Sequence, residues 1–296
     1  MTDSFSSYHP IINMFFFMLV LVFSMFFMHP ACLVISFISA FTYSIYLNGK
    51  KALRFSLIFI LPILIITALV NPLFNHKGGT ILTYLRSGNP LTLESIVYGL
   101  AAALMLVAVI SWFSCFNTVM TADKFAYLLG RVIPSLSLIL YMSFRFIPSF
   151  KAQIKVISDA QKCIGRDMSN GSIISKARHG IRIISIMVTW VLENAIETAD
   201  SMKGRGYGLP GRTAFSIFRF DRRDAFALLY ILSCAAVVLT GAAMGAYHFR
   251  YYPTIKGDWT GAPAIVVFTA YFALGAFPLI INIKEDIVWK RIESKT

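Results

Sequence analysis

The chain has 296 residues, of which 57% are hydrophobic and only 14% are charged. A soluble protein of this length carries far more charge on its surface, so the composition excludes a soluble globular protein and indicates an integral membrane protein. The four cysteines are scattered without paired spacing and the five histidines are isolated, which argues against disulfides and against a metal site. The net charge of +13 must then be located, because basic residues set the orientation of membrane helices.

Six apolar stretches predict membrane-spanning helices, because each approaches the roughly 20 residues that a helix needs to cross a bilayer. They cover about residues 11–28, 32–47, 55–73, 92–115, 225–248 and 264–283. The first is expected to be retained, because the ten residues before it contain no Lys or Arg and no cleavage site follows it. Pro62 and Pro72 are expected to kink or end the third helix, and Thr92 and Glu94 suit the start of the fourth.

The connections between these helices differ in charge. The short loop 48–54 is basic and is therefore expected to face the cytoplasm, whereas the Gly-rich and weakly charged linker 75–92 suits the outside. The segment 125–148 is apolar, but Arg131, Arg145 and two prolines leave a clean core of only about ten residues, too short to cross. If it crossed, the basic residues between Arg145 and Arg223 would lie outside, against the charge rule.

We therefore predict an all-α integral membrane protein with about six transmembrane helices. A long cytoplasmic helical insertion separates the fourth span from the fifth, and both termini are cytoplasmic. In this scheme residues 1–116 hold four spans, residues 117–224 form the cytoplasmic region, and residues 225–296 hold two spans.

The first half of the insertion predicts an amphipathic helix, because apolar residues recur at steps of three and four while lysines lie off this stripe. The stripe consists of Ile147, Phe150, Ile154, Ile157, Ala160 and Ile164. A turn is predicted at residues 167–172. A second helix over residues 181–208 is apolar early and acidic late, and it ends in glycines that Pro210 follows.

The two predicted helix ends share the pattern D-x-x-K-x-x-G at an offset of 41 residues. The shared positions are Asp159, Lys162 and Gly165 at the first end, and Asp200, Lys203 and Gly206 at the second. Each end combines an acid and a lysine one turn apart with a glycine that can take the left-handed cap conformation. Arg166 follows the first glycine and Arg205 precedes the second. Two similar basic helix tips would suit two similar sites on a dimeric partner.

The stretches "SFRFIP", "DAQKCIGRD", "ADSMKGRGYG" and "NPLFNHKGGT" resemble the transmembrane T component of energy-coupling-factor (ECF) importers. The resemblance covers most of residues 70–225. It implies that this chain lies in the cell membrane of a prokaryote. It also implies that two of its helices, each ending in an Ala-Arg-Gly motif, dock into grooves on two cytosolic ABC ATPases. It also implies a small membrane partner, the S component, which captures a vitamin or a transition-metal ion.

Carried over by position, Gly204, Arg205 and Gly206 form the second motif, with glycine in place of alanine. The first motif falls on residues 163–165 and lacks its arginine, for which Arg166 is the candidate substitute. The residues of this first motif are Cys163, Ile164 and Gly165. The supporting residues at the two ends are Asp159, Lys162, Asp200 and Lys203.

No catalytic role is expected for this chain. It contains no GxxxxGK[ST] loop, so ATP and Mg²⁺ are expected on partner ATPases and no cofactor on the chain itself. Glu193, Glu197 and Asp200 fit a solvated helix face better than an acid site. An intramembrane enzyme is disfavoured, because it would need buried acids, histidines or a metal motif in the spans, and the interiors of the predicted spans lack them. The alternative to a coupling subunit is a membrane scaffold or receptor whose basic insertion binds an unrelated cytosolic protein. Lipid is an expected partner and nucleic acid is not.

Overall fold

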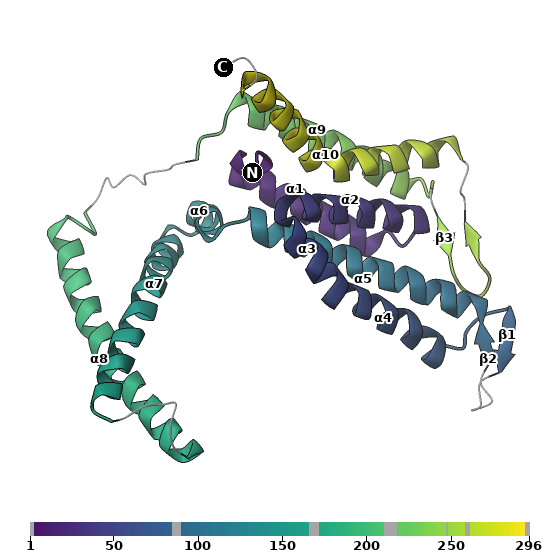
Figure 1. The fold of residues 1–296 in the computed structure, drawn as a ribbon. Helices are drawn as coiled ribbons and strands as arrows, with labels where there is room; N and C mark the ends of the chain where they lie inside the picture. Colours follow the sequence, from purple (N-terminus) through teal and green to yellow (C-terminus); the bar gives the residue numbers. More distant parts are fainter. Residues whose placement is uncertain are drawn as a thin grey trace. The chain divides into compact units, whose positions relative to one another are not determined.

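The computed structural model describes residues 3–84, 90–165, 172–209, 218–246, 248–257 and 261–293. Long helices dominate these residues, which confirms the predicted all-α membrane fold (Figure 1). The chain forms two compact units, one of residues 3–124 and 218–293 and the other of residues 125–209. The predicted boundaries at 116/117 and 224/225 lie within helices of the first unit, and the assignment of the second unit to the cytoplasm stays a prediction.

The first unit is a helical bundle in which each predicted span forms a helix. Within the described residues, five helical stretches are long and apolar enough to cross a membrane, and α1, with 17 residues, is apolar but shorter. The helices are α1 (Pro10–Phe26), α2 (Pro30–Asn48), α3 (Lys50–Phe55), α4 (Leu61–Phe74), α5 (Leu93–Val119), α9 (Arg222–Ala243) and α10 (Ala262–Glu293), where α3 and α4 belong to one stretch. The prolines act there as predicted: a π-helical segment, Ser56–Ile60, precedes Pro62, and α4 ends two residues after Pro72.

Two short β-hairpins, absent from the sequence-based prediction, lie in the connections at one end of the bundle. They pair β1 (Ile81–Tyr84) with β2 (Pro90–Thr92), and β3 (Phe249–Arg250) with β4 (Lys256–Gly257). The Tyr251 hydroxyl donates to the carbonyl oxygen of Met28 at 2.6 Å, which ties the second hairpin to the end of α1. The predicted cap at the start of α5 is confirmed, because the Thr92 hydroxyl accepts from the Ser95 amide at 3.4 Å.

An aromatic cluster fills the centre of the bundle. The Trp112 side chain of α5 is fully buried, and its ring lies edge-on to Phe16 and Phe17 of α1 at centroid distances of 5.9 and 6.3 Å. Its indole Nε1 donates to the Ser36 hydroxyl of α2 at 3.0 Å. These contacts join α5 to α1 and α2, from which α3 and α4 separate it in the sequence.

The N-terminal segment, with a 3₁₀ turn at Phe5–Ser7, packs beside the last part of α10. The Asn282 side chain accepts from the Phe5 amide at 3.1 Å and donates to the Asp3 carboxylate at 2.7 Å. The N-terminal segment and the last part of α10 therefore lie at the same end of the bundle (Figure 1).

The second unit is a hairpin of two long helices, α7 (Pro134–Cys163) and α8 (Ile173–Gly204), preceded by α6 (Ala122–Val132). α7 and α8 pack through buried Ile157, Ile183 and Met187. Of the predicted stripe on the first helix, Ile157 is buried and Phe150 is half-buried, while the other members remain exposed. Neither α6 nor α7 is among the helices apolar enough to span a membrane, which agrees with the prediction that 125–148 does not cross.

α8 begins at Ile173, eight residues earlier than predicted. The early turns run through a basic stretch with Lys176 and Arg178, whose side chains are good helix formers but hide the apolar periodicity. The predicted turn at 167–172 and Pro210 lie, except for Ser172, outside the described residues.

Candidate functional site

The end of α8 is closed by a complete glycine cap. The helix ends at Gly204, Arg205 is the cap residue, and Gly206 has a φ of 80°, the left-handed conformation predicted for it. The Gly206 amide donates to the Lys203 carbonyl oxygen at 2.9 Å, and the Tyr207 amide donates to that of Met202 at 3.0 Å. These two bonds are those of a Schellman motif, which fixes the direction in which the chain leaves the helix.

The end of α7 has the same geometry. Its cap residue, Ile164, has φ and ψ of −97° and 19°, close to the −87° and 10° of Arg205. Gly165 has a φ of 77°, and its amide donates to the Lys162 carbonyl oxygen at 2.9 Å. The structure therefore matches the two repeats position by position, with Ile164 where the second repeat has Arg205. Arg166, the candidate substitute, lies outside the described residues.

The side chains at both tips are solvent-exposed. Lys162 lies 3.8 Å from Asp159, but both side chains are at least half exposed, so this ion pair contributes little to stability. At the other tip Arg205, Lys203 and Asp200 are all exposed. An exposed arginine at a rigid helix end offers five donors in a fixed fork, which suits a carboxylate or backbone carbonyl groups of another protein.

A cavity of about 490 Å³ lies between α7 and α8 beside the second tip. Its lining includes Arg205, Arg145, Glu197, Ser149 and Asn194. The sequence did not predict Arg145 as part of the docking site, although the helical spacing was visible. Met142, Arg145 and Ser149 recur at helical spacing on α7, as do Asn194, Glu197, Ser201 and Arg205 on α8. The cavity therefore adds a second arginine to the candidate docking site.

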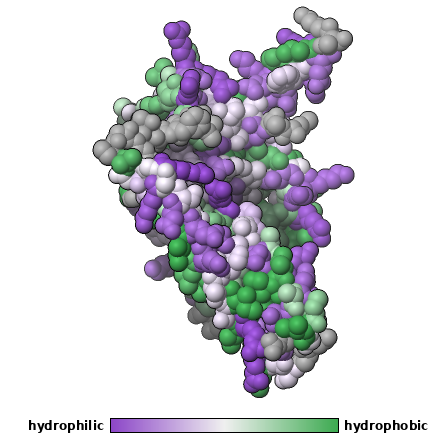
Figure 2. Space-filling model, turned by 90° about the vertical axis from the view of Figure 1, so that its left-hand side faces the viewer, coloured by the Kyte–Doolittle hydropathy of each residue, from purple (hydrophilic) through white to green (hydrophobic). Residues whose placement is uncertain are grey.

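A separate hollow on the hairpin, about 360 Å³ in volume, has only apolar lining. Ile154 from α7 and Ile184, Val188 and Leu192 from α8 line it, and all four are exposed. Figure 2 views the molecule from the left-hand side of Figure 1 and shows hydrophobic side chains gathered in the lower part of this view. The hairpin thus combines polar tips with an apolar flank.

No group of three or more His, Cys, Asp or Glu side chains within the described ranges could hold a metal ion. The exposed basic side chains and the rigid glycine caps of the tips support binding to another molecule.

The glycines at the second tip give a local test. Replacing Gly206 with alanine forces a Cβ into a left-handed residue, so we expect the cap to lose about 1–2 kcal/mol. The matched control is Gly204→Ala. Gly204 is helical and has no atom within 4 Å of an added Cβ, so we expect a neutral or stabilising effect. Hydrogen exchange of the Gly206 and Tyr207 amides should be faster only in Gly206→Ala, and equal exchange in both variants would contradict this cap assignment.

The structure defines a class of protein: an all-α, multi-pass membrane protein that carries a hairpin of two long helices with matched, exposed tips. A family model described as "Cobalt transport protein" (CbiQ) matches residues 4–217, which include both tips. The chain therefore belongs to the CbiQ family, the family of ECF transporter T components, and the resemblance seen in the sequence is confirmed.

Individual relatives share the name "Energy-coupling factor transporter transmembrane protein EcfT". The one from Lactobacillus helveticus (strain DPC 4571) is 26% identical over 157 residues, which are 48% of this chain and 57% of that protein. The one from Lacticaseibacillus paracasei (strain ATCC 334) is 30% identical over 110 residues, 37% of this chain and 40% of that protein. The one from Staphylococcus aureus (strain 04-02981) is 27% identical over 191 residues, 59% of this chain and 69% of that protein. The chain thus matches only about half the length of the first two relatives.

Proposed function

We propose that this chain is the coupling subunit of an ECF-type importer. In this role it transmits the ATP-driven motion of two cytosolic ABC ATPases to a small membrane S component that captures a vitamin or a metal ion. The observation that carries the proposal is the pair of matched helix ends, since a dimeric partner with two similar grooves needs two similar tips. ATP and Mg²⁺ are bound by the partners, and this chain has no catalytic role.

The shape of the hairpin supports a mechanical role. α7 has 30 residues and α8 has 32, so each helix is about 45 to 48 Å long. Packing through Ile157, Ile183 and Met187 stiffens the pair. A displacement applied at an exposed tip is therefore carried along the helices and not absorbed in a loop.

The docking site in this proposal comprises Arg205 with its flanking glycines and the cavity that Arg205 shares with Arg145. Two guanidinium groups against one carboxylate, Glu197, leave a net positive charge that attracts an acidic side chain of the ATPase. The first tip has Ile164 at the position of Arg205, so Arg166 must supply its charge. We therefore propose that the two tips dock unequally.

The distribution of charge supports an orientation with both termini in the cytoplasm. Basic residues are frequent at the end of the bundle from which the hairpin leaves, and sparse at the end with the β-hairpins. The described ones at the former end are Lys50, Lys51, Arg54, Lys124, Arg219, Arg222, Arg223, Lys284, Lys290 and Arg291, and those at the latter are Lys77, Arg250 and Lys256.

Affinity purification in mild detergent tests the function. From a host with its own ABC ATPases and small membrane proteins, we expect the tagged chain to retain two ATPase subunits and one small, very hydrophobic protein, identified by mass spectrometry. The identity of that small protein would indicate the substrate. Recovery of a folded, monodisperse chain without any ATPase would contradict the proposal and favour the membrane scaffold.

A further inference from the structure

The N-terminal segment Phe5–His9 contacts both places where the chain connects the bundle to the hairpin unit. Lys124 is the last residue of the bundle before the chain enters the hairpin unit, and the chain returns at residue 218. Arg223 and Asp224, in the first turn of α9, follow shortly after this return. All the contacts described below lie within the first unit.

At the first connection, Lys124 is buried, with 6% of its surface exposed. Its Nζ donates to the Ser6 carbonyl oxygen at 2.5 Å, to the Ser6 hydroxyl at 2.7 Å and to the Val119 carbonyl oxygen at 2.9 Å. Burial lowers the pKa of Lys124 to about 8, and the charge of Asp3 opposes this shift. The contacts join the N-terminal segment to the end of α5.

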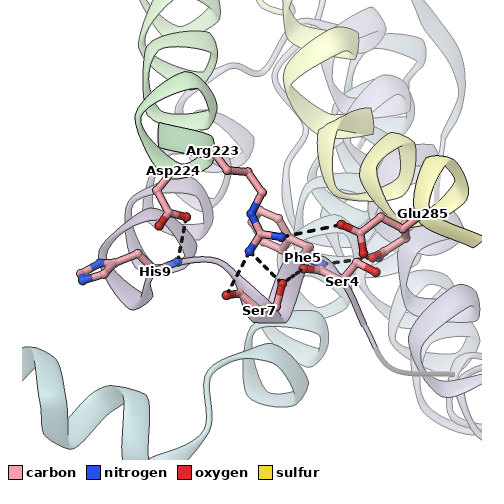
Figure 3. Close-up of polar contacts among 8 residues, drawn as sticks. Ser4, Phe5, Ser7, His9, Arg223, Asp224 and Glu285 are labelled. Carbon is pink, nitrogen blue, oxygen red and sulfur yellow. Dashed lines mark hydrogen bonds and ion pairs between the residues drawn. The ribbon is translucent and has the colours of Figure 1, made fainter. Parts of the chain in front are cut away.

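At the second connection, Arg223 lies over the N-terminal segment (Figure 3). Its Nη2 donates to the Ser7 hydroxyl at 3.1 Å, its Cζ lies 4.3 Å from the centroid of the Tyr8 ring, and its Nη1 lies 3.8 Å from the Glu285 carboxylate of α10. Burial raises the pKa of Tyr8, which keeps its ring neutral beneath the guanidinium.

Asp224 completes this second connection. It is buried, with one carboxylate oxygen accepting from the His9 amide at 3.2 Å and the other accepting from the Asp221 amide at 3.0 Å. The second bond belongs to a capping box at the start of α9. The segment is also held to α10, because Asn282 accepts from the Phe5 amide and the Phe5 ring packs 6.1 Å from Phe277.

We propose that Phe5–His9, held by Lys124, Arg223 and Asp224, form a clasp that fixes the two connections of the hairpin to the bundle. Lys124 and Arg223 are positioning residues: they make a displacement of the hairpin move α5, α9 and α10 and prevent its loss in local bending of the connections. This inference rests on the proposed function, because it assigns the clasp to the transmission of force from the ATPases.

Hydrogen exchange of the co-purified complex tests the clasp, with Mg-ATP plus vanadate as the probe that traps closed ATPases. Arg223→Ala removes the contacts to Ser7, Tyr8 and Glu285. The matched control is Arg222→Ala, which removes the same charge from the neighbouring position. Both arginines are exposed, so the comparison isolates the contacts that Arg223 makes. Lys124→Met opens the other connection and keeps the test informative if Arg223→Ala fails to fold.

In the wild type and in Arg222→Ala, we expect the probe to change exchange both in the hairpin and in the first turns of α9. In Arg223→Ala and Lys124→Met, the hairpin response should persist, while the α9 response falls about tenfold, the change expected from losing one charge-assisted hydrogen bond. A variant that only folds less well would exchange faster even without Mg-ATP and vanadate. In that case the hairpin response and the α9 response to the probe would fall together.

The opposing outcomes are distinct. If the hairpin of the wild type shows no response to the probe, the proposed function is wrong and the clasp transmits no force. If the hairpin responds in every variant and the α9 response of Arg223→Ala equals that of Arg222→Ala, the coupling role of the clasp is overturned while the proposed function stands.

Discussion

Arg205→Ala is expected to abolish most of the ATPase recovery that the tagged wild-type chain gives. In the proposed complex Arg205 is desolvated against a carboxylate or carbonyl groups, and truncating one member of such a contact costs about 2 to 5 kcal/mol. The affinity should then fall by about 30-fold or more. Arg205→Lys should be intermediate, because lysine keeps the charge and loses the planar fork of donors.

The control for this experiment is Arg178→Ala. Arg178 is an exposed arginine near the start of α8, far from the second tip at the end of that helix, so its replacement removes the same charge without changing the second tip. Binding of ATPase to purified variants, measured at several salt concentrations, separates a specific contact from a general loss of positive charge. Equal binding by Arg205→Ala and Arg178→Ala would exclude the second tip as a docking site.

Trp112→Ala is expected to cost about 3–5 kcal/mol of unfolding free energy, the largest single effect on the fold. The indole is fully buried among Phe16, Phe17 and Tyr43, so its removal leaves a cavity that the surrounding helices cannot close. In a membrane this cost comes from lost packing contacts, because lipid tails are as apolar as the side chains. The removal also takes the donor from the Ser36 hydroxyl.

The adjacent residue provides the control. Phe113 is 52% exposed on the outside of the bundle, where lipid can replace the lost ring, so Phe113→Ala should change stability little. Trp112→Phe should lie between the two because it keeps most of the volume and loses the Nε1 donor. Thermal unfolding of the detergent-solubilised variants measures the order. A midpoint for Trp112→Ala equal to that of Phe113→Ala would contradict the central role of this cluster.

Some features follow from the sequence alone because they are local. Hydropathy over about 20 residues marked the spans, since a bilayer demands a continuous apolar helix. Gly165 and Gly206 were placed correctly at helix ends because only glycine takes the left-handed conformation without strain. The start of α8 was missed because charged helix formers concealed its periodicity.

The candidate site was predicted only in part. The second tip follows from its glycines and Arg205, but the place of Arg145 beside it depends on how α7 packs against α8. Periodicity shows which residues share a face of one helix and leaves open which face of a neighbouring helix it meets.

The sequence by itself determined the membrane class, the helical spans and the matched ends of the hairpin, because each depends on residues within a few turns of one another. Only the tertiary structure decided the clasp and the aromatic centre. Ser6 and Lys124 are 118 residues apart, and Ser7 and Arg223 are 216 apart. No local pattern pairs such residues. Their contacts exist because the packing of the helices in the bundle brings the N-terminal segment against Lys124, after α5, and against the first turn of α9.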